Sequence, residues 1–589
     1  MIQVKRTGRK RFANYEFHIL WLPFLILFFI FTILPILSSV VLSFTDFDAV
    51  SSPRFIGLDN YFRMFTGDEV LPVALKNTVM FAIFIGPFGF ALSFFLAWII
   101  NEFGKTARSI LSFLFYSPAL VGNVFYIWQI AFSGDAYGYI NSFLMSFGIV
   151  TEPIQWFRNE SYVFPLIVVI QLWLSMGVSF LANIAGLQNV DDELYEAGAI
   201  DGIKTRWHEL WYITLPSMKS ILLFGIVMQI QAAFSVGAIP MALAGYPSVN
   251  HAVDTILSHL QDVGTERFEM GYASAISVLL FVLIIVTKKL LTKFVNFMGR
   301  YARMKNKKAY RKYTRSVIGN IFYFAFLIVF GAFAILPLVI QVITSFKPLD
   351  ELLIFPPRFY VVRPTFENYK VLPTLLSNLK IPLSRYVFNS LFVSVTATVL
   401  HIFVASGAAY TISKSKIKYK NIVFAFVQFA LLFNAYTLAI PRYLIYSNLR
   451  MIDTYLVYIL PYIPSTLGVF LMKQFMDTGI PDALLEAAQI DGAGQFRVFF
   501  RIALPLVKPA WLTLALFAFR DMWTITGSGT IFTESMKTLP EITSTIASGG
   551  LARSGSAMAM SVIMMIPPII VYLISQSSVK ETMSTSGIK

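Results

Sequence analysis

The sequence predicts an all-α integral membrane protein with about twelve transmembrane helices, arranged as two parallel six-helix repeats. Of the 589 residues, 57% are hydrophobic and only 13% are charged, whereas soluble domains carry roughly 25% charged residues. Apolar stretches near the ~20 residues that a spanning helix needs recur along the whole chain. A lipid bilayer is therefore the first partner that the composition implies.

Six apolar stretches precede a basic interval, and six follow it. The first comes after the basic segment 1–16 and is too long for the core of a signal peptide. The stretches lie at about 17–44, 77–100, 109–132, 163–187, 219–243, 271–292, 318–345, 386–410, 421–446, 454–474, 507–530 and 556–577.

The distribution of charge predicts the orientation. The interval from Lys288 to Arg315 contains eleven Lys or Arg residues and no acid, which places it in the cytoplasm by the positive-inside rule. Six spans on each side of this interval put both termini in the cytoplasm as well. The loop at 45–75, with five acids against two arginines, is expected outside. The net charge of +15 thus faces the cytoplasm, and we expect no nucleic acid partner.

The two halves of the chain are copies of each other. Ile33-Leu34-Pro35 recurs as Ile335-Leu336-Pro337, and Asn77-Thr78 recurs as Asn389-Ser390. An even number of spans separates the equivalent positions, so the copies run parallel through the membrane. We therefore divide the chain into a cytoplasmic N-terminus at 1–16, a first half at 17–293, a cytoplasmic linker at 294–316 and a second half at 317–589.

The strongest internal match lies in the cytoplasmic loops after the fourth and tenth stretches. The segment from Leu194 to Gly202 matches the segment from Leu484 to Gly492 at a constant offset of 290. Leu-x-Glu-Ala favours a helix, Asp-Gly ends it, and a later Leu-Pro starts the next helix. We expect a helix, a turn and a second helix at 191–216 and again at 481–505.

These loops resemble the EAA loops of permease subunits in bacterial ATP-binding-cassette importers. In the second copy, Glu486-Ala487-Ala488 is followed by Gly492 and then by Ile502-x-Leu504-Pro505, as in the family. The first copy departs from the pattern at Gly198, which replaces the second Ala, and by one extra residue after Gly202. The resemblance implies that the loops couple to the ATPases through Glu196, Ala197, Asp201, Gly202, Glu486, Ala487, Ala488, Asp491 and Gly492.

Further segments resemble the paired permeases of carbohydrate importers of the maltose-uptake type, here fused into one chain. They are 55–61, 364–369 and 452–462. The resemblance implies the translocation subunit of an ATP-driven, binding-protein-dependent importer for a sugar or oligosaccharide in the bacterial cytoplasmic (inner) membrane. Its implied partners are a pair of cytoplasmic ATPase subunits, which use ATP and Mg, and an extracytoplasmic solute-binding protein.

We expect the chain itself to be no enzyme and to bind no cofactor. Gly104-Lys105-Thr106 resembles the end of a phosphate-binding loop, but Ile99 stands where that motif requires Gly. There is no cysteine, and His251 and His259 are expected in a solvated external loop, so we predict no metal site. His401, inside a span, is expected to be a hydrogen-bonded packing residue.

Polar residues within the spans are candidates for the substrate pathway. Arg520 and Asp521 follow Pro505 by 15 and 16 residues, about 22–24 Å along the helix. With Trp523 and Thr524 they offer the aromatic face and hydrogen-bonding groups that a sugar requires. An ion pair that only orients the helix explains the charges equally well. Weaker candidates, which can equally join helices by hydrogen bonds, are Trp173, Gln229, Gln231, Asn434 and Tyr436.

Two other classes of protein compete with this interpretation. An ion-coupled secondary transporter also favours two six-span halves, but it requires coupling carboxylates in several spans, and the spans of the first half are almost uncharged. An intramembrane enzyme requires a nucleophile with a base, or a metal centre. With no Cys and five scattered His, the sequence offers neither.

Overall fold

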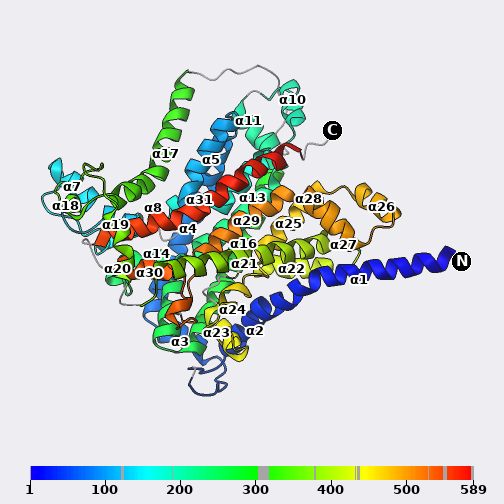
Figure 1. Cartoon of the computed structure of the whole chain (residues 1–589), viewed down its shortest axis with the longest axis horizontal. Coiled ribbons are helices and arrows are strands. Elements are labelled where there is room, and N and C mark those ends of the chain that lie inside the picture. Colours follow the sequence, from blue (N-terminus) through cyan, green and yellow to red (C-terminus); the bar gives the residue numbers. More distant parts are fainter. Residues whose placement is uncertain are drawn as a thin grey trace. The chain divides into compact units, whose positions relative to one another are not determined.

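The computed structural model describes residues 2–585 except for 49, 121–124, 189, 204, 303–316, 377–379, 432, 434–437, 528 and 548–552. Within these ranges the chain forms helices joined by loops, and the one β-type pairing is an isolated bridge between Thr45 and Phe55 (Figure 1). The predicted all-α class is confirmed.

Seven helices among the described residues are long and apolar enough to cross a membrane. They are Tyr15–Leu42, Val70–Ile100, Ile221–Ala244, Met270–Lys293, Tyr323–Ser345, Leu383–Lys414 and Ser554–Ser575. The count rises to nine if each of two bent pairs forms one span: Glu160–Leu174 with Val178–Gln188, and Gln495–Leu506 with Lys508–Trp523.

In the other three predicted stretches the structure describes shorter helices. They are α5 (Lys105–Leu120) and α6 (Phe125–Ala131), α22 (Lys420–Ala430) and α23 (Ala439–Asn448), and α24 (Leu456–Ile459) and α25 (Thr466–Gly479). The stretch at 454–474 is broken between α24 and α25, where Pro461 and Pro464 lack the N–H that a continuing helix needs. Hydrophobicity alone gave no sign of this break.

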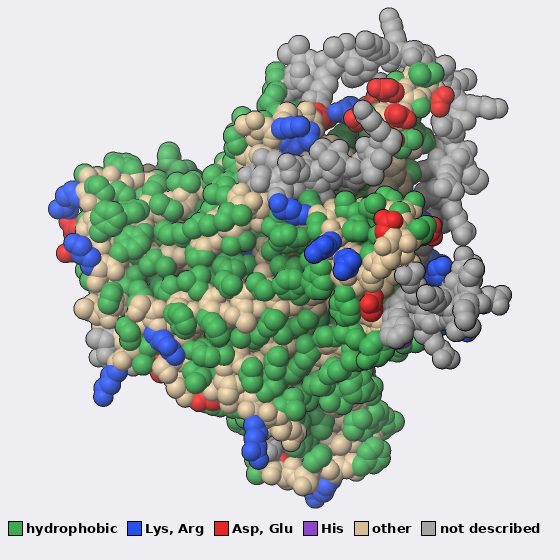
Figure 2. Space-filling model, turned by 45° about the vertical axis from the view of Figure 1, so that its right-hand side comes forward, with side chains coloured by type: hydrophobic (Ala, Val, Ile, Leu, Met, Phe, Trp, Pro, Cys, Tyr) green, Lys and Arg blue, Asp and Glu red, His purple; other side chains and the backbone are tan. Residues whose placement is uncertain are grey.

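The surface is apolar, as a membrane protein requires. Hydrophobic side chains cover most of the face shown in Figure 2, and few charged side chains lie on it. Large exposed hydrophobic residues such as Ile26, Phe88 and Phe392 lie on the long helices. Lipid chains are a solvent that covers such a surface without free-energy cost.

The chain divides into two compact units, and each combines segments from both halves of the sequence. Unit 1 comprises Met1–Phe55, Val371–Ser548 and Ile563–Ile588, and unit 2 comprises Ile56–Lys370 and Gly549–Val562, with Lys589. Besides α22 to α25, unit 1 contains α1 (Ile2–Phe28), α2 (Leu34–Leu42), α20 (Leu372–Leu375), α21 (Leu383–Lys414), α26 (Asp482–Ile490), α27 (Gln495–Val498), α28 (Leu504–Leu506), α29 (Lys508–Trp523), α30 (Leu539–Ala547) and the later part of α31 (Ser554–Thr585).

Unit 2 holds most of the first half of the sequence together with the first span of the second. Besides α5 and α6, it contains α3 (Asp59–Thr66), α4 (Val70–Ile100), α7 (Tyr139–Ser146), α8 (Glu160–Leu174), α9 (Val178–Gln188), α10 (Asp192–Ile200), α11 (Arg206–Glu209), α12 (Leu215–Ser217), α13 (Lys219–Phe234), α14 (Ala238–Ala244), α15 (Ile256–Gln261), α16 (Met270–Ala302), α17 (Val317–Ser345), α18 (Leu349–Leu352) and α19 (Glu367–Lys370).

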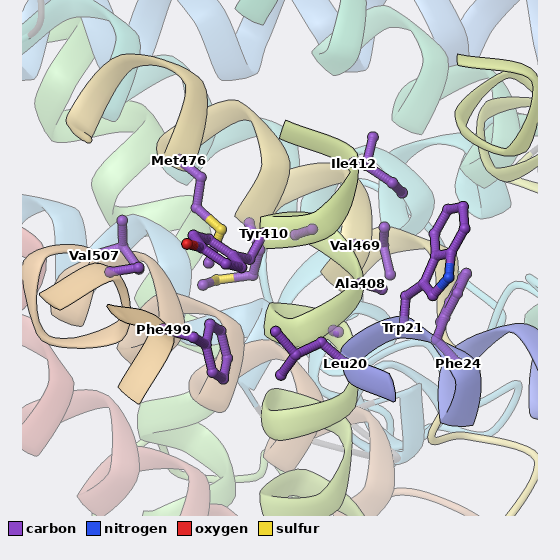
Figure 3. Packing of buried hydrophobic residues seen from close by; sticks show 14 of the residues in the cluster. Leu20, Trp21, Phe24, Ala408, Tyr410, Ile412, Val469, Met476, Phe499 and Val507 are labelled. Carbon is purple, nitrogen blue, oxygen red and sulfur yellow. The ribbon is translucent and has the colours of Figure 1, made fainter. Parts of the chain in front are cut away.

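The N-terminal helix packs in the core of unit 1, along α21. Leu20, Trp21 and Phe24 of α1 are buried in one cluster with α21 residues that include Ala408 and Tyr410 (Figure 3). The two backbones approach closely at Gly407, where an added Cβ would lie 2.6 Å from the carbonyl oxygen of Leu20. The first span of the first half is therefore held by the second half.

The first span of the second half lies in unit 2, with most of the first half. Helix α17 packs against α5 and α6, and the indole Nε1 of Trp173 in α8 donates to the carbonyl of Ala334 in α17 at 3.1 Å. The compact units therefore do not coincide with the sequence repeats. Helix α16 also continues to Ala302, into the interval that we assigned to the linker.

In unit 2, the pair Asn77-Thr78 fastens the long helix α4 to the loop before α15. The Asn77 side-chain amide donates to the carbonyls of His251 and Asp254, at 2.8 and 2.9 Å. The Thr78 hydroxyl accepts the backbone N–H of Ile256 at 2.9 Å. These bonds satisfy backbone groups at the start of α15.

In unit 1, the matching pair Asn389-Ser390 makes the same bonds. The Asn389 amide donates to the carbonyls of Ser535 and Lys537, at 2.9 and 2.8 Å. The Ser390 hydroxyl accepts the N–H of Leu539, the first residue of α30, at 2.8 Å. The residues that match in sequence therefore make matching contacts.

We expect Asn389→Asp to destabilise the protein by about 1–3 kcal/mol, because a carboxylate would face two carbonyl oxygens without donors. Thermal unfolding in detergent measures the loss. The control is Asn448→Asp at an exposed position, which should leave Tm unchanged. Equal shifts of Tm for both variants would contradict a stabilising role of the two Asn389 hydrogen bonds.

Candidate functional site

Both EAA segments contain the predicted helix and glycine turn. Helices α10 and α26 end at Ile200 and Ile490, each with an Asp as its C-cap, and the following Gly202 and Gly492 have φ values of 89° and 87°. In the second copy, the N–H of Ala493 donates to the Ala488 carbonyl at 3.0 Å, and that of Gly492 to Gln489 at 3.1 Å. This pair of bonds is a Schellman motif, which requires a left-handed residue at the glycine position.

The first copy has the same turn. The N–H of Ile203 donates to the Gly198 carbonyl at 2.9 Å, and that of Gly202 to Ala199 at 3.3 Å. At Gly198, which replaces the second Ala, an added Cβ would lie 2.5 Å from Cδ1 of Ile213, so an Ala there would need the Ile213 side chain to shift.

The structure locates the extra residue of the first copy. Helices α10 and α26 begin at Asp192 and Asp482, an offset of 290, whereas α11 and α27 begin at Arg206 and Gln495, an offset of 289. The insertion therefore falls between Gly202 and Arg206. The helices before and after it keep the path that they have in the second copy.

After the turn, each copy continues into a π-helical segment that the sequence did not predict. These segments are Leu210–Thr214 and Phe499–Ala503, followed by the two Leu-Pro pairs in α12 and α28. In the second copy the helix Gln495–Leu506 then bends by 78° into Lys508–Trp523. The EAA segment is thus linked through a short helix to a membrane-spanning one.

The two short helices start differently. Asp191 caps α10 by accepting the N–H of Glu193 at 3.0 Å. Pro481 stands at the corresponding position of α26, and Asp482 is 2.8 Å from Nζ of Lys414. The hydrogen bond and the charge of Lys414 lower the pKa of the Asp482 carboxyl.

The predicted coupling residues form an exposed acidic and apolar surface on each helix. Glu196, Ala197 and Asp201 are exposed in the first copy, as are Glu486, Ala487, Asp491 and Gly492 in the second; Gly202 is buried, and Ala488 is half-buried. Beside them lie Ile200 and Ile490, whose exposed fractions are 73% and 83%. Such exposed apolar side chains are typical of an interaction surface.

A family model for "Binding-protein-dependent transport system inner membrane component" matches this chain twice, over residues 79–300 and 375–584. The chain belongs to this family. Each match includes one EAA segment, so the protein is a fusion of two permease domains. It is a multi-pass membrane protein.

The permease is similar to curated relatives that match about half of its length. A probable ABC transporter permease of Bacillus subtilis, YesP, is 32% identical over 284 residues, which cover 47% of this chain and 90% of YesP. The Escherichia coli inner membrane ABC transporter permease YcjP is 28% identical, covering 47% and 98%. The arabinooligosaccharides transport system permease AraP of Bacillus subtilis is 29% identical, covering 45% and 83%.

The charged candidates for the substrate pathway come together in unit 1. Nε of Arg520 lies 3.4 Å from the Asp521 carboxylate, and the Tyr462 hydroxyl donates to that carboxylate at 3.3 Å. Thr524 bonds the backbone carbonyls of Arg520 and Asp521 instead, at 3.3 and 3.2 Å. Tyr462 also belongs to this group. The sequence did not indicate it as a candidate, because it lies 59 residues from Asp521 along the chain.

The other candidates are engaged in packing. Trp523 is fully buried and donates to the Met564 carbonyl at 2.9 Å. Trp173 is also fully buried, and Gln229 donates to the Ile85 carbonyl at 3.3 Å. Gln231 is half-buried. Asn434 and Tyr436 lie outside the described residues. A role of these residues in the substrate pathway stays a prediction.

The expectation of a solvated loop at His259 was wrong. His259 is buried, with Nε2 2.8 Å from the Asp68 carboxylate and Nδ1 3.1 Å from the Tyr246 hydroxyl. Burial alone would raise the pKa of Asp68, but hydrogen bonds from Tyr272 and His259 lower it overall. His251, which is partly exposed, pairs with Asp254 at 2.6 Å.

His401 is a buried packing residue, as predicted, and its Nδ1 lies 2.7 Å from the Ile463 carbonyl. Among the residues that the structure describes, no three or more His, Cys, Asp or Glu side chains form a group that could hold a metal ion.

We expect Gly492→Val to destabilise the turn by about 1–2 kcal/mol, because the left-handed backbone is strained for a residue with a Cβ. Gly492→Asn should cost less, since Asn tolerates this conformation. The rate of limited proteolysis at the EAA segment measures how often the turn at Gly492 unfolds locally.

The control is Gly104→Val, between α4 and α5, where an added Cβ meets no atom within 4 Å. Equal cleavage rates for the Val and Asn variants of Gly492 would argue against a requirement for the left-handed conformation.

Proposed function

We propose that this chain is the translocation subunit of an ATP-driven, binding-protein-dependent importer for a sugar or oligosaccharide. The observation that carries the proposal is the presence of two exposed EAA segments with the same turn geometry, one in each domain of a binding-protein-dependent permease. The sugar is supported by relatives such as the permease named for arabinooligosaccharides.

ATP hydrolysis belongs to separate subunits in this proposal. The Gly104-Lys105-Thr106 segment lacks the first glycine of a nucleotide-binding loop and lies at the start of helix α5. A pair of cytoplasmic ATPases would bind ATP and Mg and grip the exposed faces of α10 and α26. Glu196 and Glu486 act as docking residues there and make or break no bond.

The coupling path runs through rigid backbone. Movement of α26 passes across the Gly492 turn into the helix Gln495–Leu506 and, at the 78° bend, into α29. Helix α29 carries Arg520 and Asp521, and Tyr462, in the loop before α25, donates to the Asp521 carboxylate. We propose these three residues as part of the substrate pathway. A displacement of the cytoplasmic segment thereby reaches polar side chains within the membrane.

The proposed function places the chain in a particular membrane and orientation. The chain lies in the bacterial cytoplasmic membrane with both termini inside, and an extracytoplasmic solute-binding protein delivers the sugar. This orientation rests on the basic interval at 288–315 and on the number of predicted spans.

Co-purification tests the proposal most directly. The detergent-solubilised chain, tagged at its C-terminus, should recover a pair of ATPase subunits whose activity rises with a sugar-loaded binding protein. Recovery of the chain alone, with sugar uptake abolished by collapse of the proton or sodium gradient, would instead favour an ion-coupled secondary transporter.

We expect the charge reversals Glu196→Lys and Glu486→Lys, made together, to lower ATPase recovery and sugar uptake at least tenfold while the chain is expressed normally. Like charges placed at an interface cost several kcal/mol, so a loss of this order is the minimum that repulsion predicts.

The control is Glu367→Lys, an exposed carboxylate in the loop 346–384 that we place outside the membrane. It should leave ATPase recovery at the wild-type level. Wild-type uptake in the double EAA variant would remove the docking role.

A further inference from the structure

The helix that follows the second EAA turn has no cap from its own N-terminal residue. The helix Gln495–Leu506 is preceded by Gly494, which has no side chain. In the first copy, Thr205 stands at the equivalent position, and its side chain accepts the N–H of His208. The first backbone N–H groups of a helix need such acceptors.

Glu16 of the N-terminal helix α1 supplies an acceptor at this helix start, for the N–H of the first residue and not of the third, which Thr205 bonds in the first copy. Oε2 of its carboxylate accepts the backbone N–H of Gln495. The other oxygen, Oε1, lies so close that a Cβ on Gly494 would be 2.7 Å from it. The carboxylate thus occupies the space that a capping side chain at position 494 would need, and its charge suits a helix N-terminus.

A second set of contacts fixes Glu16 in place. The ring of Phe17 stacks on Tyr410 at 5.5 Å, and Tyr410 packs on Phe499 at 5.4 Å. The Tyr410 hydroxyl also donates to the side chain of Gln495 at 2.9 Å. Phe17 of α1 and the start of the helix Gln495–Leu506 are therefore both attached to Tyr410, which belongs to the cluster of Figure 3.

We propose that the Glu16 side chain caps the N-terminus of the helix Gln495–Leu506, and that Glu16 is a positioning residue that holds the second EAA segment for coupling. The capping role depends only on the contacts above, whereas the coupling role rests on the proposed function. The first EAA segment is capped by its own Thr205, so the N-terminal helix acts on one of the two segments.

An exchange of caps tests this proposal. Glu16→Ala removes the acceptor, and we expect hydrogen exchange of the amides of residues 495–498 to become about fivefold faster, in line with the loss of a typical N-cap. Gly494→Thr alone should also speed exchange, because its Cβ meets the Glu16 carboxylate. The double variant Glu16→Ala/Gly494→Thr should return close to the wild-type rate, since Thr caps the helix as Thr205 does and the backbone there, with φ of −72° and ψ of 162°, accepts Thr.

Two controls accompany the measurement on the full-length protein. Tyr15→Ala changes an exposed neighbour on α1, and the peptide at 205–217 reports the first copy in the same spectra. Both should stay at the wild-type rate. Unchanged exchange in Glu16→Ala, or a double variant no slower than Glu16→Ala, would overturn the cap.

The coupling role has a separate readout. With ATPase subunits bound, substrate-stimulated ATPase activity should fall in Glu16→Ala and recover in the double variant. Exchange that changes as expected, with ATPase activity unaffected, would overturn positioning for coupling. Failure of any ATPase to bind the wild-type chain would reject the proposed function instead, and the exchange rates would still decide the cap.

Discussion

Every backbone carbonyl in the apolar interior needs a hydrogen-bond donor, and this constraint governs where the polar side chains of the spans are found. Pro568 in α31 has no N–H, which leaves the carbonyl of Met564 without its helical partner, and the indole of Trp523 donates to it at 2.9 Å. His401 lies 2.7 Å from the carbonyl of Ile463, and Trp173 donates to the carbonyl of Ala334. At Pro568, the lost helical hydrogen bond is thus replaced by one from a long polar side chain on another helix.

The same constraint explains what could be read from the sequence. The repeat, the EAA segments and their turns follow from local patterns, because Asp-Gly and Leu-Pro act on the backbone where they stand. Side-chain partners are distant: the partner of His259 is Asp68, 191 residues earlier. From the sequence, a polar residue in a span therefore suggested a substrate contact and a contact between helices equally. Only the fold distinguishes a Trp that donates to a backbone carbonyl from one whose ring is free to stack on a sugar.

The packing of the first spans was also beyond the sequence. Helix α1 lies in the unit of the second half because Gly407 of α21 allows its backbone to approach Leu20. A glycine in an apolar stretch indicates that some backbone comes close, without identifying which one. Helix α17 likewise lies in the unit of the other half, but it packs against α5 and α6, whereas α1 packs along α21, the counterpart of α4. The linker therefore separates the two sequence repeats but does not separate the two compact units.

The exchange of first spans makes the two EAA segments unequal. Both have the Schellman turn at glycine, and both continue through a π-helical segment into a span. Thr205 lets the first segment form its helix from its own residues, whereas Gly494 leaves the second dependent on Glu16 from the start of the chain. A glycine at this position is unfavourable within the segment alone but is required by the carboxylate that lies against it. The second EAA segment therefore has a capped helix only when α1, from the first half, is present. Fusion of both halves in one chain ensures that each molecule contains both.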